Sequence, residues 1–270
     1  MTRADPGMLP APTASQPAEP VPRSFRIPSA AAGAVPTFVL VHGVGLSHRF
    51  YIGLARILAR QGDVVSFDLP GFGVSPTPGQ PLTIEDFAAG VVPRLERLRR
   101  QSPSGPVIVI GHSMGAQVAV ELAVRHPSLV DAVVLVGPVV DPARPTLTQQ
   151  ALALARDAPL ELPSTQLQVL YDYARCGPAW FLAASTAMRD YPTHRVIEQL
   201  TQPLLVLRGQ RDPIAKVSWT RELSTRVPGA IHRTIPGRRH NVPNGDPAGT
   251  ADPILRFVRA LRPTPAGKTR

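Results

Sequence analysis

Hydrophobic residues gather in short continuous runs along the first half of the chain, and each run stops at a glycine-rich or polar turn. Runs of this length without alternation are typical of strands buried on both faces of a parallel sheet. The predicted strands cover residues 38–41, 64–67, 107–110 and 132–136. Between them, hydrophobic residues recur at helical spacing over residues 51–58, 84–100 and 114–125. This alternation predicts a parallel sheet covered by helices on both faces.

The helix over residues 84–100 has both a start signal and an internal proline. Thr83 and Asp86 have the spacing of a capping box, in which two side chains satisfy each other's backbone N–H groups. We therefore expect the helix to begin at Ile84. Pro93 has no amide hydrogen, so it either kinks this helix or marks its true start.

The alternation breaks after Gly137 and resumes near residue 203. An insertion at this place is suited to be a lid, and helical patterns cover residues 147–156, 164–175 and 178–188. The pattern then continues with a strand, a helix, a strand and a closing helix over residues 203–207, 215–226, 231–235 and 246–261. We therefore divide the chain into a Pro-rich flexible leader (1–34), a core (35–138 and 200–262), a helical lid (139–199) and a basic tail (263–270).

The motif Gly111-His112-Ser113-Met114-Gly115 directly follows a predicted strand and directly precedes a predicted helix. This is the context of a nucleophile elbow, a sharp turn that exposes a serine hydroxyl in strained backbone geometry. The glycines are needed because a side chain beside such a turn would collide with neighbouring elements. The turn also places Ser113 at the positive end of a helix, where the Met114 N–H can face a developing oxyanion.

A serine hydroxyl is protonated near neutral pH, so a nucleophilic serine needs a base and an acid that orients the base. Asp212 and His240 each follow a predicted strand, and the strand-end loops of an open parallel sheet meet at one edge. We therefore predict Ser113 as nucleophile, His240 as base and Asp212 as acid. Asp141 follows the strand over residues 132–136 and is the alternative acid.

With these residues the chain, from about residue 37 to residue 261, resembles the α/β-hydrolase superfamily. The likeness also includes the His42-Gly43 turn, residues 68–75 and the order Ser, Asp, His. The resemblance implies a mostly parallel central sheet with helices on both faces and a helical lid inserted after the sixth family strand. It further implies an oxyanion hole formed by the N–H groups of Val44 and Met114. Only residues 24–27 suit an early strand, so we expect a shortened N-terminal edge of the sheet.

The predicted chemistry is hydrolysis of an ester, lactone or related acyl bond through an acyl-enzyme on Ser113. The fold says little about the substrate, because the insertion shapes the pocket. Apolar residues of the insertion either line an acyl pocket or pack the lid itself: Leu170, Tyr173, Trp180, Phe181 and Met188. Our candidate pocket residues are Trp180, Phe181, Val140 and Val242. Two alternatives stay open: a carbon–carbon bond hydrolase or acyltransferase with the same triad, and a small-molecule receptor with little turnover.

The net charge of +10 arises from 29 Lys and Arg residues against 19 Asp and Glu residues. Half of the excess follows Asp252, where five basic residues occur without an acid, and the rest is scattered. Nucleic-acid binding proteins cluster their basic residues on one face or interleave them with aromatic residues. The distribution therefore argues for a small-molecule substrate and against a nucleic-acid partner.

Cys176 is the only cysteine, which excludes an intrachain disulfide, and no group of residues has metal-ligand spacing. No apolar run approaches the roughly 18 residues of a membrane helix, and the leader lacks the apolar core of a secretory signal. We therefore expect a cytoplasmic protein without a membrane span that needs neither a cofactor nor a metal.

Overall fold

The computed structural model of the protein describes residues 21–29, 35–101, 105–144, 146–157 and 160–261. Residues 1–20 of the predicted leader and the whole of the predicted basic tail lie outside these ranges. None of the helices in the described ranges is both long enough and apolar enough to span a bilayer.

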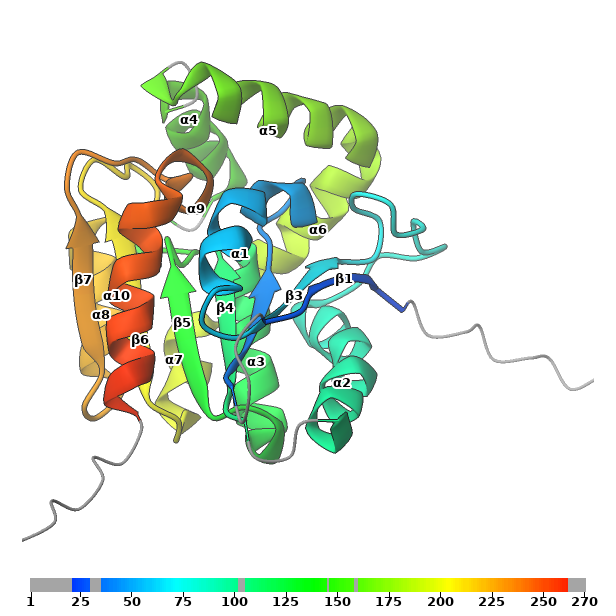
Figure 1. Ribbon diagram of the computed structural model, residues 1–270. Coiled ribbons are helices and arrows are strands. Elements are labelled where there is room, and N and C mark those ends of the chain that lie inside the picture. Colours follow the sequence, from blue (N-terminus) through cyan, green and yellow to red (C-terminus); the bar gives the residue numbers. More distant parts are fainter. Residues whose placement is uncertain (1–20, 30–34, 102–104, 145, 158–159, 262–270) are drawn as a thin grey trace, which may run out of the picture.

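The described residues form one seven-stranded sheet with the strand order β1-β3-β2-β4-β5-β6-β7 (Figure 1). All neighbouring strands are parallel except β1, which pairs antiparallel with β3. The strands are β1 (Arg23–Ile27), β2 (Thr37–Val41), β3 (Asp63–Asp68), β4 (Val107–His112), β5 (Ala132–Val136), β6 (Leu204–Gly209) and β7 (Ile231–Ile235). The predicted mostly parallel sheet and its single short early strand are confirmed.

Helices cover both faces of the sheet (Figure 1). One face carries α1 (Ile52–Leu58) and α10 (Pro247–Ala260), and the other carries α2 (Ile84–Gln101), α3 (Met114–Arg125) and α8 (Val217–Thr225). Successive side chains of a strand point to opposite faces. In β2, Val39 therefore joins the hydrophobic cluster under α2 and α3, whereas Phe38 and Leu40 join the cluster under α1 and α10. Burial on both faces explains why the central strands β2, β4 and β5 are mainly apolar, whereas the edge strands β1 and β7 are partly exposed and carry polar residues.

The helix α2 begins at Ile84, as the capping box predicts. Thr83 Oγ1 accepts the Asp86 N–H at 3.2 Å, and Asp86 Oδ2 accepts the Thr83 N–H at 2.8 Å. Pro93 lies inside the helix, so the alternative that it marks the start is wrong.

A helical insertion joins β5 to β6, and its first two helices lie over the carboxyl ends of the strands (Figure 1). It contains α4 (Leu147–Asp157), α5 (Pro163–Cys176), α6 (Pro178–Asp190) and α7 (Thr193–Val196). The first three agree with the helices predicted from the sequence. Neither α7 nor α9 (Val242–Gly245) was predicted, because four residues are too few to show a helical period.

Candidate active site

Ser113 occupies the sharp turn between β4 and α3. Its backbone has φ 54° and ψ −120°, and it is the one non-glycine residue with positive φ in the described part of the chain. Such a conformation costs on the order of 1–3 kcal/mol and persists only where the surroundings hold it. The Ser113 N–H donates to the Val136 carbonyl at 3.0 Å, which ties the turn to the end of β5.

The two glycines of the motif make this turn sterically possible. A Cβ atom added to Gly111 would lie 2.1 Å from the Gly115 carbonyl oxygen. A Cβ atom added to Gly115 would lie 2.1 Å from the Val41 carbonyl oxygen at the end of β2. Both distances are far below van der Waals contact with rigid backbone, so the turn requires glycine at each position.

The loop after β2 lies against Ser113. A Cβ atom added to Gly43 would lie 3.0 Å from the Ser113 Cβ atom. Within the described ranges, neither the Val44 N–H nor the Met114 N–H donates to an acceptor. Unpaired amides beside the serine are the groups that could stabilise a negative charge on a substrate oxygen.

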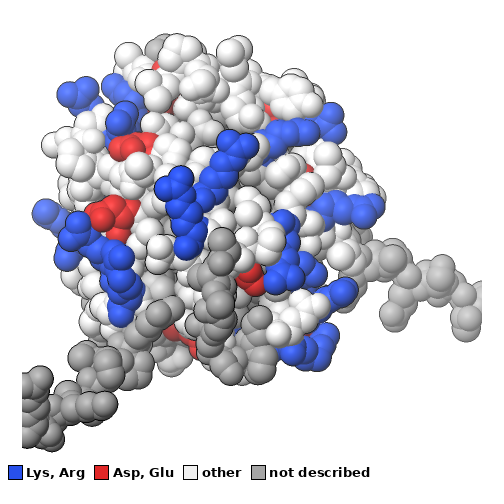
Figure 2. Space-filling view, in the orientation of Figure 1, with Lys and Arg blue, Asp and Glu red and all other residues white. Residues whose placement is uncertain are grey.

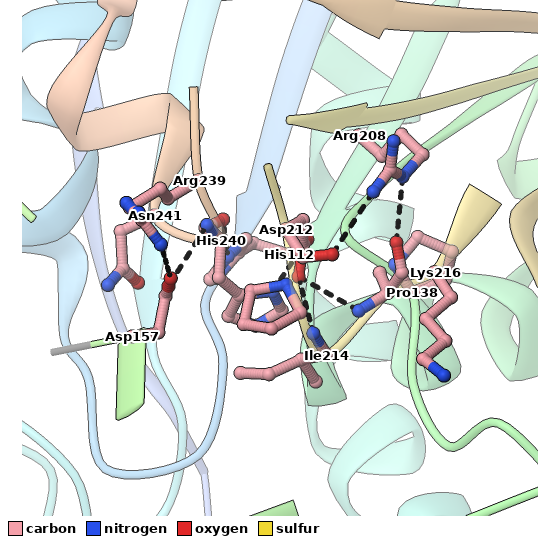
Figure 3. A network of polar contacts seen from close by, with 12 residues as sticks. His112, Pro138, Asp157, Arg208, Asp212, Ile214, Lys216, Arg239, His240 and Asn241 are labelled. Carbon is pink, nitrogen blue, oxygen red and sulfur yellow. Dashed lines mark hydrogen bonds and ion pairs between the residues drawn. The ribbon is translucent and has the colours of Figure 1, made fainter. Parts of the chain in front are cut away.

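Asp212 and His240 form a buried pair (Figure 3). His240 Nδ1 lies 2.9 Å from Asp212 Oδ2. Asp212 Oδ1 accepts the N–H groups of Ile214 and Ala215 at 2.8 and 2.9 Å. An ionised carboxylate can only accept hydrogen bonds, so Nδ1 of His240 carries the proton and Nε2 is free to accept one.

Burial and charge act in opposite directions on this pair. Burial lowers the pKa of His240, but the Asp212 carboxylate outweighs burial and holds that pKa above its ordinary value of 6.5. Burial likewise raises the pKa of Asp212, but His240 and the two backbone N–H groups outweigh it, so that pKa lies below 3.8. At neutral pH, Asp212 is therefore ionised.

A buried arginine at the end of β6 fixes the loop that carries Asp212 (Figure 3). Arg208 donates from Nη2 to the Asp212 carbonyl at 3.1 Å and from Nε to the Ala215 carbonyl at 2.8 Å. These bonds hold the backbone on both sides of the two N–H groups that the Asp212 carboxylate accepts. Arg208 therefore sets the direction of that carboxylate.

The alternative acid, Asp141, makes other contacts. Its Oδ1 accepts the Ala143 N–H at 2.9 Å, and its carbonyl accepts the Arg144 N–H at 2.8 Å. Both bonds lie within its own turn. The structure therefore pairs Asp212, rather than Asp141, with His240.

His112 joins the turn of Ser113 to the loop of His240. Its Nε2 lies 3.1 Å from the His240 carbonyl oxygen, and the two imidazole rings are 4.9 Å apart. A carbonyl oxygen only accepts, so His112 Nε2 donates. Burial and the neighbouring His240 lower the pKa of His112 to about 3, so this histidine is neutral at physiological pH. It connects the two loops without adding a charge.

Two carboxylates of the helical insertion bond to the same loop, and one of them, Asp157, lies on the side of His240 away from Asp212 (Figure 3). Asp157 is 1% exposed, and it accepts the His240 N–H at 3.3 Å and Arg239 Nη1 at 2.8 Å. Glu161 accepts the Asn241 N–H at 2.9 Å, and burial raises its pKa. The insertion is therefore bonded directly to the backbone of the histidine loop.

Three of the four candidate pocket residues share one side of the sheet, because Phe181 packs against the hydrophobic cluster that contains Trp180 and Val140. Phe181 is beside the loop after β2, because a Cβ atom added to Gly45 would lie 2.9 Å from its ring. Trp180 and Val140 belong to the hydrophobic cluster under α2 and α3, whereas Val242 belongs to the cluster on the opposite face. Of the four, Phe181 is therefore the best placed to meet a molecule bound at Ser113.

Comparisons with known proteins agree with this architecture. The sequence model for the alpha/beta hydrolase fold matches residues 36–183. An uncharacterized protein of Mycobacterium tuberculosis is 27% identical over 279 residues, covering 89% of this chain and 79% of that protein. A pimeloyl-(acyl-carrier protein) methyl ester esterase of Aromatoleum aromaticum is 27% identical over 230 residues, covering 72% of this chain and 87% of the esterase.

A solved structure shows the same fold. A thermophilic esterase from Thermogutta terrifontis superposes with a TM-score of 0.74 at 20% sequence identity, covering 90% of this chain and 94% of the esterase. The family match spans more than half of the chain, and it confirms the resemblance found in the sequence. The chain belongs to the α/β-hydrolase fold family and is an enzyme.

Proposed function

We propose that the protein is a serine hydrolase that cleaves an ester or related acyl bond of a small, apolar molecule through an acyl-enzyme on Ser113. The observation that carries this proposal is the buried hydrogen bond of 2.9 Å between Asp212 and His240, in a loop that His112 ties to the strained serine turn. The methyl ester esterase among the relatives supports an ester as the bond that is cleaved.

The first half of the reaction forms the acyl-enzyme. His240 Nε2 takes the proton of Ser113 Oγ while that oxygen attacks the carbonyl carbon of the substrate. The carbonyl oxygen becomes negative, and the N–H groups of Val44 and Met114 stabilise it by roughly 3 kcal/mol each. The bond to the leaving group then breaks, and the leaving group takes the proton from His240.

The second half releases the acid. Water gives a proton to His240 Nε2 and attacks the acyl carbon, and the same two N–H groups hold the second oxyanion. The bond to Ser113 Oγ breaks, and the serine recovers its proton from His240. Asp212 keeps its charge throughout and stabilises the imidazolium that forms in each half.

Aromatic side chains of the insertion support an apolar acyl group. A Cβ atom added to Gly45 would lie 2.6 Å from the Tyr173 ring and 2.9 Å from the Phe181 ring, so both rings lie against the loop that carries Val44. Apolar walls with a few polar groups are typical of small-molecule sites. We therefore place the acyl chain of the substrate against Tyr173 and Phe181.

The test is turnover of a panel of esters, thioesters and lactones by the whole chain. We expect hydrolysis of at least one ester, and Ser113→Ala should reduce kcat by roughly three to six orders of magnitude. Ser218→Ala is the matched control, because Ser218 is exposed on α8 and should leave kcat unchanged. Full activity in Ser113→Ala, or no turnover across the panel, would contradict the proposal.

A further inference from the structure

Helix α5 presents its hydrophobic side chains to solvent. Leu167, Leu170 and Tyr171 are 70%, 64% and 49% exposed. Residues separated by three and four positions share one helix face, so the three form a single apolar stripe. In a globular protein such a stripe normally faces the core. Leu170 therefore faces solvent, whereas we expected it either to line a pocket or to pack the lid.

The opposite face of α5 packs against the core through Val169 and Tyr173, and hydrogen bonds also hold it inward. Asp172 is 1% exposed, and its Oδ2 accepts Ser47 Oγ at 2.8 Å. Thr165 is also 1% exposed and donates to Asn244 Oδ1 at 2.7 Å. Rotating the helix to bury its leucines would break both bonds and leave the buried Ser47 hydroxyl without its acceptor. The outward direction of the apolar stripe is therefore fixed by the core.

Positive charge flanks the stripe. The guanidinium carbons of Arg49 and Arg175 lie 5.3 and 5.8 Å from the centre of the Tyr171 ring. Asp172 is the only acid in α5, and it is buried, so the outer face of the helix carries no exposed carboxylate. In Figure 2 the upper edge of the molecule, where α5 runs in Figure 1, is mostly uncharged.

Other segments of the insertion also expose hydrophobic residues. Of the twelve exposed large hydrophobic residues in the described ranges, seven lie between α4 and α6: Leu152, Leu160, Leu162, Leu167, Leu170, Tyr171 and Leu182. Exposed apolar side chains that gather on one side of a protein mark an interaction surface.

We propose that the outer face of α5, defined by Leu167, Leu170, Tyr171 and Arg175, docks onto an anionic lipid surface. A convex apolar stripe with a tyrosine and arginines at its edge matches helices that lie in the plane of a lipid interface. The cations face the negative headgroups, and the absence of exposed acids in α5 removes repulsion. The proposal is independent of the acyl chemistry, but docking would turn the edge of the sheet that carries Ser113 toward the lipid.

The experiment is flotation of the full chain with vesicles of phosphatidylcholine, with and without phosphatidylglycerol. We expect stronger binding to the anionic vesicles. The double variant Leu167→Gln, Leu170→Gln should bind at least about tenfold more weakly, because two apolar side chains no longer enter the interface. The matched control is the double variant Ile27→Gln, Val217→Gln, which changes exposed hydrophobic residues on β1 and α8 and should bind like the wild type.

A second pair of variants tests the charge. Arg175→Gln should weaken binding to the anionic vesicles about fivefold and leave binding to pure phosphatidylcholine unchanged. Arg195→Gln, an exposed arginine on α7, is the control. Equal binding of the leucine double variant and the wild type would overturn the proposal, as would no binding by the wild type. A wild-type dimer that the leucine double variant converts to a monomer, seen by light scattering, would instead assign the stripe to a second copy of the chain.

Discussion

The loops at the strand ends differ from helix α5 of the insertion in how their buried carboxylates are hydrogen-bonded and in which side chains face solvent. In the loops, both oxygens of Asp212 are bonded, and the residue is buried where the sheet pattern predicts a strand end. In α5, Oδ1 of buried Asp172 has no partner, and leucines face solvent. Local pattern and burial agree in the loops where we propose the reaction site, and they disagree in α5, where we propose a docking surface.

The two regions meet at the histidine loop. Asp157 and Glu161 belong to the insertion, yet they accept backbone N–H groups of His240 and Asn241. A movement of the insertion would therefore change the contacts of the residue that we propose as the base. Substituting Asp157 or Glu161 removes these hydrogen bonds, so their effect on the histidine loop can be measured.

The largest effect should come from removing the acid. We expect Asp212→Asn to lower kcat by about four orders of magnitude, because the amide favours the wrong tautomer of His240. Asp141→Asn is the matched control and should stay within a few-fold of wild type, because the hydrogen bonds of Asp141 to described residues lie within its own turn. Equal losses in both variants would contradict the assignment. Steady-state kinetics on the best ester of the panel is the measurement.

The same variant should move the pH profile. His240 acts as a base only when neutral, so kcat/KM falls as the pH drops through its pKa. Asp212 holds that pKa above 6.5, so the acid limb of the wild type should have its midpoint above 6.5. In Asp212→Asn the midpoint should move to lower pH. His112 does not contribute to this limb, because its pKa is about 3. An unchanged midpoint would mean that another group titrates.

A smaller loss should follow when the insertion is detached from the histidine loop. We expect Asp157→Ala to lower kcat about 10- to 100-fold, since it removes the acceptor of the His240 N–H and displaces the base. Asp157→Asn keeps an acceptor and should recover part of the activity. The control is Asp190→Ala, which removes an exposed partner of Arg189 in the same insertion. A wild-type rate in Asp157→Ala would show that the contact does not position His240.

The smallest effects concern the stability of α5. Asp172→Ala should lower the free energy of unfolding by about 1–3 kcal/mol, because buried Ser47 Oγ loses its acceptor. Leu167→Gln should change it by less than about 0.5 kcal/mol, because that side chain is already in water. Urea unfolding measures both values. If Leu167→Gln is less stable than Asp172→Ala, the apolar stripe of α5 faces the core in solution.

The sequence predicts those parts of the structure that depend on residues close together in the chain. The strands β2 and β4, the start of α2 and the turn at Ser113 all have local signals, namely apolar runs, a capping box and paired glycines. Arg208 and Asp157 have none, because their partners are set by how separate loops fold back on one another. For α5, the pattern shows an amphipathic helix but not which face is buried, and the polar bonds of Asp172 and Thr165 decide that.

The central claim is that Ser113 is the nucleophile, and covalent labelling tests it most directly. A fluorophosphonate should add one group per chain, and peptide mass spectrometry should place that group on Ser113. Ser113→Ala should remain unlabelled, and Asp212→Asn should be labelled much more slowly, because His240 is then a poorer base. Labelling at another residue, or ester turnover without any adduct on Ser113, would contradict the account.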